Sequence, residues 1–230
     1  MKAPIMPRPR IGITTSYADG KQSLDVHYVH AIEAAGGLPL IVPVFDSADA
    51  AADFTALLDG LVITGGPGIT QGLIGTLPDD LEPVDPLRDQ NDRRVFESMQ
   101  DRPVLGICYG MQFINAQAGG TIYADVQAQK PGTLAHSSGR GGTEHPVRFE
   151  PQSRLQQILN APEMIANTYH IQAVSDIGAG LKAVGFGPDG VVEAIESDDG
   201  RLIGVQFHPE RMLDRARPLF EDFVHRARQT

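Results

Sequence analysis

The turn around Cys108 constrains this chain more than any other feature. Residues 103–107 form a short apolar run of largely branched side chains, which predicts a buried β-strand. Residues 109–118 predict a helix that ends at the Gly119-Gly120 pair. Cys108 therefore falls on a strand-to-helix turn with glycine two positions away on either side. Such a turn holds a nucleophile in a strained, exposed position, because the glycines remove Cβ atoms that would clash.

Two interpretations of Cys108 follow from this turn. The N-terminus of the helix behind the sulfur would stabilise a thiolate and lower the pKa of the thiol, which favours a catalytic role. The alternative is an inert core cysteine, since free cysteine is among the most buried residue types. The turn alone leaves both interpretations open.

A second apolar run lies far downstream and carries the groups that a nucleophilic thiol requires. Residues 201–207 predict a strand that ends in His208-Pro209-Glu210. A thiol needs a base to accept its proton, and the base needs a partner that fixes its tautomer. Chemistry in α/β sheets collects at the carboxyl ends of strands. We therefore predict that Cys108 is a nucleophile, His208 its base and Glu210 the residue that orients His208, although a lone histidine here would more often be structural.

Buried strands and amphipathic helices alternate along the first half of the chain. Strands are expected at residues 10–15, 38–44, 60–64 and 103–107, and helices at residues 24–35, 47–58, 86–100 and 109–118. The second half is richer in short strands, expected at residues 146–150, 181–186 and 191–196, and closes with a helix at residues 214–228. This order predicts a three-layer α/β fold with a mostly parallel central sheet, helices on both faces and additional short antiparallel strands. We expect a single domain over residues 1–230.

Composition limits where the protein acts and what it binds. A lone cysteine allows no intramolecular disulfide and is typical of a reducing compartment, so a cytoplasmic location is expected. No apolar run approaches the ~20 residues that span a bilayer, and membrane association is not expected. The net charge of −10 argues against nucleic acid as a partner. A small-molecule substrate is expected, and the chain could form a homodimer.

The motif Gly106-x-Cys108-x-Gly110-x-Gln112 followed by His208-Pro-Glu210 resembles the class I glutamine amidotransferase family. Within that family the chain is most similar to the γ-glutamyl-γ-aminobutyrate hydrolase branch, which is peptidase C26-like. The resemblance runs nearly end to end, through residues 10–15, 28–39, 59–66, 88–89 and 167–172. It implies the flavodoxin-like fold of class I glutamine amidotransferases.

The resemblance also implies roles for individual residues. Cys108, His208 and Glu210 match the family's nucleophile, base and orienting residue. The backbone N–H groups of Gly66 and Tyr109 match its oxyanion hole, and the same pair is expected from an elbow whose second donor comes from a neighbouring loop. The resemblance further points to a substrate-binding set of three residues, for which packing roles are the alternative: Gln112, His170 and Gln172.

Two departures from the family pattern bear on the substrate. Many members carry an acidic residue shortly after the position of Gly66, where this chain has residues 67–70 without one, and many have arginine where Tyr109 stands. No cofactor or metal is expected, because His27 and His30 have the spacing of a metal pair but no further ligands grouped beside them. The segments at residues 66–89 and 129–143 are expected to be loops near the elbow.

Three classes of function remain open. The first is a free-standing hydrolase that cleaves the γ-amide of a γ-glutamyl amine through a thioester. The second is a glutaminase subunit that delivers ammonia to a synthase partner. The third is a non-catalytic binding protein on the same fold, which the intact cysteine, histidine and glutamate argue against.

Overall fold

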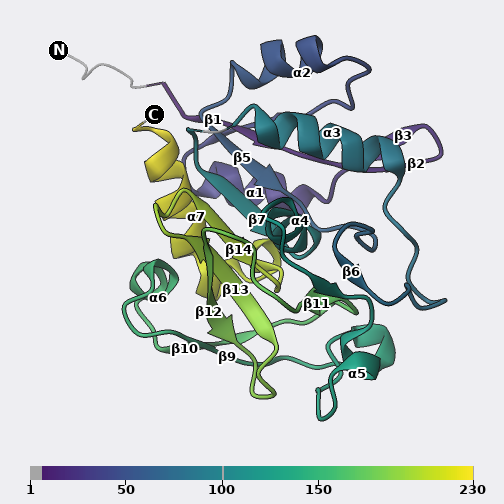
Figure 1. The fold of residues 1–230 in the computed structure, drawn as a ribbon. Helices are drawn as coiled ribbons and strands as arrows, with labels where there is room; N and C mark the ends of the chain where they lie inside the picture. The colour runs from purple at the N-terminus through teal and green to yellow at the C-terminus, as the bar shows by residue number, and fades with distance from the viewer. Residues whose placement is uncertain (1–6, 100, 230) are drawn as a thin grey trace.

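The computed structural model describes residues 7–99 and 101–229, and its centre is one long sheet (Figure 1). Five strands of this sheet are parallel neighbours in the order β14-β7-β5-β1-β4. Their bounds are β1 Arg10–Ile13, β4 Leu38–Ile41, β5 Gly60–Ile63, β7 Val104–Ile107 and β14 Leu202–Val205. β5, β7 and β14 are buried along their whole length, as strands covered on both faces must be.

An antiparallel extension continues the sheet beyond β14. It runs β13-β12-β9-β10, with bounds β13 Val192–Ser197, β12 Leu181–Phe186, β9 His145–Phe149 and β10 Glu163–Ala166. A small sheet joins β6 Leu73–Ile74, β8 Ile122–Tyr123 and β11 Ala173–Val174, and a hairpin pairs β2 Ser16–Ala18 with β3 Lys21–Ser23. The expected mostly parallel sheet with antiparallel additions is confirmed.

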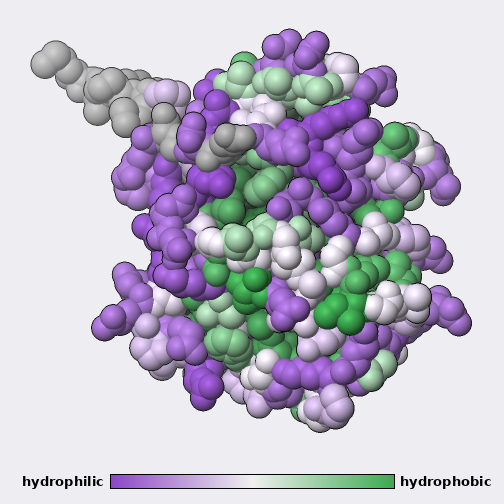
Figure 2. Space-filling model, viewed as in Figure 1, coloured by the Kyte–Doolittle hydropathy of each residue, from purple (hydrophilic) through white to green (hydrophobic). Residues whose placement is uncertain are grey.

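Helices cover both faces of the sheet, and the sheet separates two apolar cores (Figure 1). On one face lie α1 Val26–Ala34, α6 Arg154–Leu159 and α7 Leu213–Ala227; on the other lie α2 Ala48–Thr55, α3 Pro86–Glu97 and α4 Tyr109–Gln117. Side chains alternate between the cores along a strand, as β5 shows: Val62 joins the core of α7, and Leu61 and Ile63 join that of α4. Figure 2 shows hydrophilic side chains gathered over α3.

The expected elements agree with the structure to within a few residues at their ends. The end of the helix expected at residues 86–100 falls on Gln100, which lies outside the described residues. The hairpin β2–β3, the small sheet, α5 Val126–Gln129, α6 and β10 were not predicted, because short segments carry too little periodicity. Within the described residues, no helix has the length and apolar character needed to cross a membrane.

Candidate active site

Cys108 joins β7 to α4 in a strained conformation. Its φ of 53° and ψ of −104° lie in a region that non-glycine residues rarely adopt. Both flanking glycines are required by close contacts: a Cβ on Gly106 would lie 2.5 Å from the carbonyl oxygen of Gly110, and one on Gly110 would overlap the carbonyl oxygen of Ile63. The predicted strained elbow is thus present, and neighbouring backbone explains its glycines.

The Cys108 side chain is less accessible than the sequence suggested. Only 7% of the residue is exposed, whereas an exposed elbow was expected. The reason is that the surrounding loops close over the turn and leave a cavity of about 70 Å³. Cys108 lines this cavity together with the loop after β5, residues of α4 and the segment at residues 169–172, so a small ligand group can reach the sulfur.

His208 and Glu210 lie on the loop directly after β14, the strand next to β7. Nδ1 of His208 is 2.7 Å from Oε1 of Glu210, which is fully buried. Because a carboxylate can only accept, Nδ1 donates to Glu210, and Nε2 is the nitrogen left to interact with the Cys108 thiol. The structure therefore brings together the three side chains that the sequence predicted as a catalytic set.

Electrostatics favour a charged thiolate–imidazolium pair. Burial would raise the pKa of the Cys108 thiol, but the hydrogen bond and charge of His208 outweigh burial and hold this pKa below its ordinary value. Burial likewise opposes the charged form of His208, yet hydrogen bonds to Cys108 and Glu210 raise the pKa of the imidazole to about 10. A thiolate is the nucleophilic form of cysteine, so the lowered pKa favours the nucleophilic role that the sequence predicted for Cys108.

The loop that carries Gly66 is fixed by a buried arginine. The guanidinium of Arg88, on α3, donates to the carbonyl oxygens of Thr64 and Gly65 at 3.2 and 3.0 Å. It also lies 4.4 Å from the centre of the Tyr109 ring. Arg88 thus contacts both residues whose N–H groups were predicted to form the oxyanion hole. That role stays a prediction, and no sequence pattern indicated that Arg88 would be buried beside them.

Gln112, His170 and Gln172 all line the cavity of Cys108, and all are buried. Gln172 holds the loop after β5, because its side-chain amide exchanges two hydrogen bonds with the backbone of Ile69, at 2.7 and 3.0 Å. Nε2 of Gln112 donates to the carbonyl oxygen of Gln172 at 3.0 Å. Their substrate-binding roles stay predictions, since these amides already serve the walls of the cavity.

Sequence reasoning missed Gln206, which contacts the sulfur itself. Its Nε2 donates to Sγ of Cys108 at 3.5 Å, and its Oε1 accepts from Gln112 at 3.1 Å. The side chain is fully buried. The sequence offered only a partial signal: Gln206 lies two residues before His208, and side chains two positions apart in an extended segment share one side. Both residues in fact follow β14, which ends at Val205.

Two predicted loops contribute to the walls of the site, and a second pocket opens beside it. Leu81 from the segment at residues 66–89 and Ser137 from the segment at residues 129–143 line the cavity of Cys108. On the other side of Gly66, a pocket of about 180 Å³ is lined by His208 together with Ser16, Asp25, Arg211 and others. The thiol and the imidazole therefore belong to different pockets that share Gly66.

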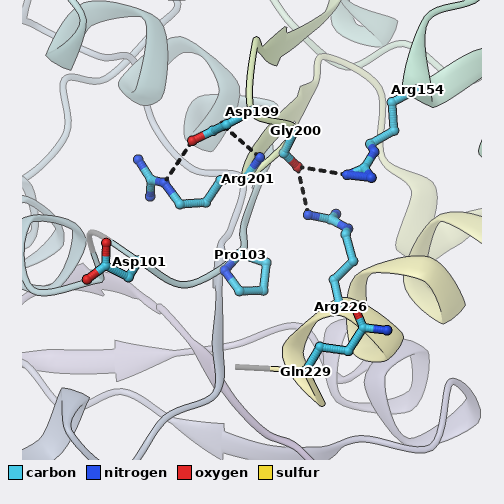
Figure 3. A pocket seen from close by; sticks show the side chains of 8 residues that line it. All are labelled: Asp101, Pro103, Arg154, Asp199, Gly200, Arg201, Arg226 and Gln229. Carbon is cyan, nitrogen blue, oxygen red and sulfur yellow. Dashed lines mark hydrogen bonds and ion pairs between the residues drawn. The ribbon is translucent and has the colours of Figure 1, made fainter.

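A larger hollow lies elsewhere and is unsuited to this chemistry. Figure 3 shows Arg154 of α6 and Arg226 of α7 pointing at the carbonyl oxygen of Gly200, while Arg201, before β14, points toward Asp199. Pro103 and Arg201 in its lining precede β7 and β14, so the hollow lies at the amino ends of the strands that end near Cys108 and His208. His27, considered as a metal ligand, is half exposed and pairs with Asp25 at 2.6 Å.

Comparison with known proteins places the chain. Residues 9–210 match the family model described as Peptidase C26. The chain belongs to the peptidase C26 family. It is 34% identical to Protein NtpR of Enterococcus hirae over 80% of this chain and 79% of the relative. It is 30% identical to a putative glutamine amidotransferase of Schizosaccharomyces pombe, over 96% and 87% of the two chains.

More distant relatives agree with this assignment. The chain is 27% identical to the gamma-glutamyl-gamma-aminobutyrate hydrolase PuuD of Escherichia coli, over 96% of this chain and 94% of the relative. Its fold matches a crystal structure described as one subunit of a putative GMP synthase from Thermoplasma acidophilum, with a TM-score of 0.69 and 18% identity, over 97% and 96% of the chains. The class I glutamine amidotransferase-like fold and a glutamine amidotransferase-like hydrolase family are thereby established.

Proposed function

We propose that this peptidase C26 member hydrolyses the γ-amide bond of a γ-glutamyl amine to glutamate and the free amine. The observation that carries the proposal is the Cys108–His208 pair at the junction of two pockets. A thiolate and a hydrogen-bonded imidazolium are the nucleophile and the general acid that cysteine-dependent amide cleavage requires. The relationship to a γ-glutamyl-γ-aminobutyrate hydrolase supports the choice of substrate class.

The proposed reaction has two halves. The thiolate of Cys108 attacks the γ-carbonyl carbon, and the oxyanion is stabilised by the backbone N–H groups of Gly66 and Tyr109. Collapse of this intermediate breaks the C–N bond as His208 gives its proton to the leaving amine, and a thioester remains. Water then loses a proton to His208 and attacks the thioester, which releases glutamate and restores the pair.

The pair controls its own proton transfer. In the free enzyme the negative thiolate helps to hold the proton on His208. Acylation removes that negative charge, so the pKa of His208 falls when the proton must leave for the amine. The neutral imidazole is then the base that the attacking water needs. Glu210 keeps the proton on Nδ1 and leaves Nε2 to face the reacting atoms.

We infer that the two ends of the substrate occupy the two pockets. The glutamyl group occupies the cavity of Cys108, because the acyl carbon stays on the sulfur. The amine occupies the pocket of His208, which donates its proton. That pocket holds about 180 Å³ and contains Asp25 and Arg211, so it accommodates an amine larger than ammonia. This supports a γ-glutamyl amine hydrolase over a glutaminase subunit that needs room only for ammonia.

A substrate panel tests the proposal directly. The purified protein is incubated with γ-glutamyl amines of different length and charge and with glutamine, and released amine, ammonia and glutamate are measured. We expect a higher kcat/KM for at least one γ-glutamyl amine than for glutamine, without added ATP, metal or partner. Cys108→Ala is the control and should be inactive. Activity with glutamine alone, and only after a synthase is added, would assign the chain to the ammonia-delivering subunits.

The setting of the reaction is part of the proposal. We place it in the cytoplasm with a small-molecule substrate and without nucleic acid or membrane partners, and a homodimer is compatible with it. The single cysteine and the acidic composition support these assignments.

A further inference from the structure

Behind the catalytic cavity, three histidines converge on one buried carboxylate. Glu193, on β13, is fully buried, and His136, His145 and His170 are between 0 and 6% exposed. Oε1 of Glu193 lies 3.4 Å from Nδ1 of His136 and 3.6 Å from Nε2 of His145. It lies 3.4 Å from Nε2 of His170, the histidine that also lines the cavity of Cys108. The ligand atoms of His136, His145 and Glu193 all lie within 4.8 Å of one another.

Each of the three rings has one nitrogen that points away from Glu193. The hydrogen-bond partner of that nitrogen determines which nitrogen carries the proton and which one faces Glu193 with a lone pair. Nε2 of His136 is 2.9 Å from the carboxylate of Asp189, and Nδ1 of His145 is 3.2 Å from the carbonyl oxygen of Pro146. Nδ1 of His170 is 2.9 Å from the carbonyl oxygen of Gln172. Carboxylate and carbonyl oxygens only accept, so these nitrogens carry the protons. In a neutral imidazole the opposite nitrogen is then an unprotonated acceptor.

With neutral imidazoles, the hydrogen-bond acceptors of the histidine rings therefore face the acceptor oxygens of Glu193, and no donor from the described part of the chain lies between them. Within the described residues, both carboxylate oxygens of Glu193 and Nε2 of His145 and of His170 are buried without a hydrogen-bond partner. Thr168 lies 3.4 Å from Nδ1 of His136, but its hydroxyl donates to the carbonyl oxygen of His136 at 2.6 Å. Several buried acceptors without a donor lower the stability of the folded protein. A bound ion is one of the recognised explanations for such a cluster.

One proton on Nε2 of His170 would pair that ring with Oε1 of Glu193, but the inward nitrogens of His136 and His145 would still face the carboxylate as acceptors. A proton on each inward nitrogen would make three imidazolium rings, with the centres of the His145 and His170 rings 4.9 and 4.6 Å from that of His136. Repulsion between such charges is severe in a buried site, and only Glu193 and Asp189 would offset it. A single divalent cation satisfies the same lone pairs without crowding three positive rings together.

The spacing also fits a metal. Zinc ligands at about 2.0–2.1 Å in tetrahedral geometry lie about 3.4 Å from one another. The measured separations of 3.4 and 3.6 Å between the ring nitrogens and Oε1 match that edge. The carboxylate of Asp189 on the far nitrogen of His136 is the partner that orients metal-binding histidines in many proteins.

We propose that His136, His145 and Glu193 bind a divalent transition-metal ion of the zinc type, with His170 beside Glu193 on the side of Cys108. The ion has a structural role, separate from the hydrolysis proposed above. It ties the segment of His136 to β9 and β13, and through the neighbouring Ser137 it fixes one wall of the catalytic cavity. Sequence patterns do not reveal this site, because its ligands are scattered over separate segments without a recognisable spacing.

Metal analysis of an inactive chain tests the site without reference to turnover. The Cys108→Ala protein removes the thiolate as a competing ligand. We expect about one zinc-class ion per chain after purification without chelators, and about one equivalent of Co²⁺ taken up after metal removal, with the visible spectrum of four-coordinate nitrogen and oxygen ligation. Glu193→Gln and His145→Gln in the same background should lose both signals. His27→Gln, which alters an exposed histidine, should keep them.

Thermal unfolding of the Cys108→Ala protein gives a second test, which does not depend on whether the Glu193 and His145 variants fold. Zinc added to the metal-free Cys108→Ala protein should raise its Tm, because a ligand that binds only the folded state stabilises it. A folded Cys108→Ala protein that contains no metal, binds no Co²⁺ and shows no change in Tm would overturn the proposal. So would Glu193→Gln and His145→Gln proteins that fold and retain the full metal content. Because the chain is inactive in every arm, these outcomes are independent of the substrate panel.

Discussion

Asn167 holds the backbone of His208 from both sides with one side chain. Its Oδ1 accepts from the N–H of His208 at 2.8 Å, and its Nδ2 donates to the carbonyl oxygen of His208 at 2.9 Å. The two residues are far apart in the chain, and Asn167 is buried where β10 ends. Asn167 therefore helps to position the imidazole of His208 relative to Cys108. It does so through the backbone of His208, since neither hydrogen bond involves the thiol or Glu210.

We predict that Asn167→Ala lowers kcat by about 10- to 100-fold with little change in KM, because small displacements of a catalytic group are costly. Steady-state kinetics on the best γ-glutamyl amine measures this split. The loss of two buried hydrogen bonds should also lower the free energy of unfolding by about 1–3 kcal/mol.

Asn160→Ala is the matched control, since Asn160 ends α6 in a left-handed conformation away from the site. It should lose stability without a comparable loss of kcat. Equal losses of kcat in both variants would show that Asn167 acts through general stability and not through His208.

Arg88 and Asp92 form a buried pair within α3, with Nε of Arg88 3.3 Å from Oδ2 of Asp92 and both side chains 1% exposed. Arg88→Met should lower the free energy of unfolding by about 3–5 kcal/mol, because it leaves the Asp92 charge unpaired. Arg88→Met with Asp92→Leu should recover much of this loss, yet remain poorly active, since the loop of Gly66 lacks its clamp. Urea unfolding and kinetics on the three proteins measure the two effects. A double variant as unstable as Arg88→Met would contradict this account.

The sequence predicted the elements that carry strong periodic signals. The parallel strands, the long helices and the turn of Cys108 all lie within a few residues of their expected positions. The reason is that the pattern of apolar residues within a buried strand or an amphipathic helix indicates which side chains are buried. The approach of His208 to Cys108 also followed, since both were expected at the carboxyl ends of strands in one sheet.

The unpredicted features depend on which segments meet in space. Gln206 and Asn167 acquire their roles from contacts across the sheet, and Arg88 became a buried clamp although arginine is usually exposed. The convergence of His136 and His145 on Glu193 depends on the antiparallel extension, in which β9 carries His145 and β13 carries Glu193. The sequence pattern around one residue does not indicate which distant residue it will contact. These contacts could therefore be found only in the structure.

Gly66→Ala should impair catalysis more than folding. A Cβ at this position would overlap the guanidinium of Arg88, and Arg88 cannot swing away because it is buried. The loop must shift, and a displaced N–H donor of an oxyanion hole costs about 10²–10³ in kcat. Gly139→Ala is the control, because its Cβ would meet only Oγ of Ser137 at 3.6 Å. Unchanged kcat in Gly66→Ala, with normal expression, would remove Gly66 from the oxyanion hole.

The thiolate of Cys108 should be visible in the pH dependence of alkylation. Burial would raise the pKa of Cys108, but His208 holds it below the ordinary value, so the thiolate is lost at a lower pH than that of an ordinary thiol. The inflection in the rate of iodoacetamide modification should therefore lie below that of a free thiol of pKa about 8.5, and the rate at pH 7, scaled to the rate above pH 9, should be correspondingly higher. A γ-glutamyl amine should slow the modification.

Substitution of the partners should move the inflection of this profile in a fixed order. In His208→Asn the burial of Cys108 loses the two largest interactions that offset it, so the inflection should move to higher pH and the rate at pH 7 should fall. Glu210→Gln keeps an acceptor for Nδ1 but removes the carboxylate charge, so its inflection should lie between those of His208→Asn and the unaltered protein. His30→Asn, on the exposed face of α1, should leave the profile unchanged. A His208→Asn profile that superimposes on that of the unaltered protein would contradict the thiolate–imidazolium pair.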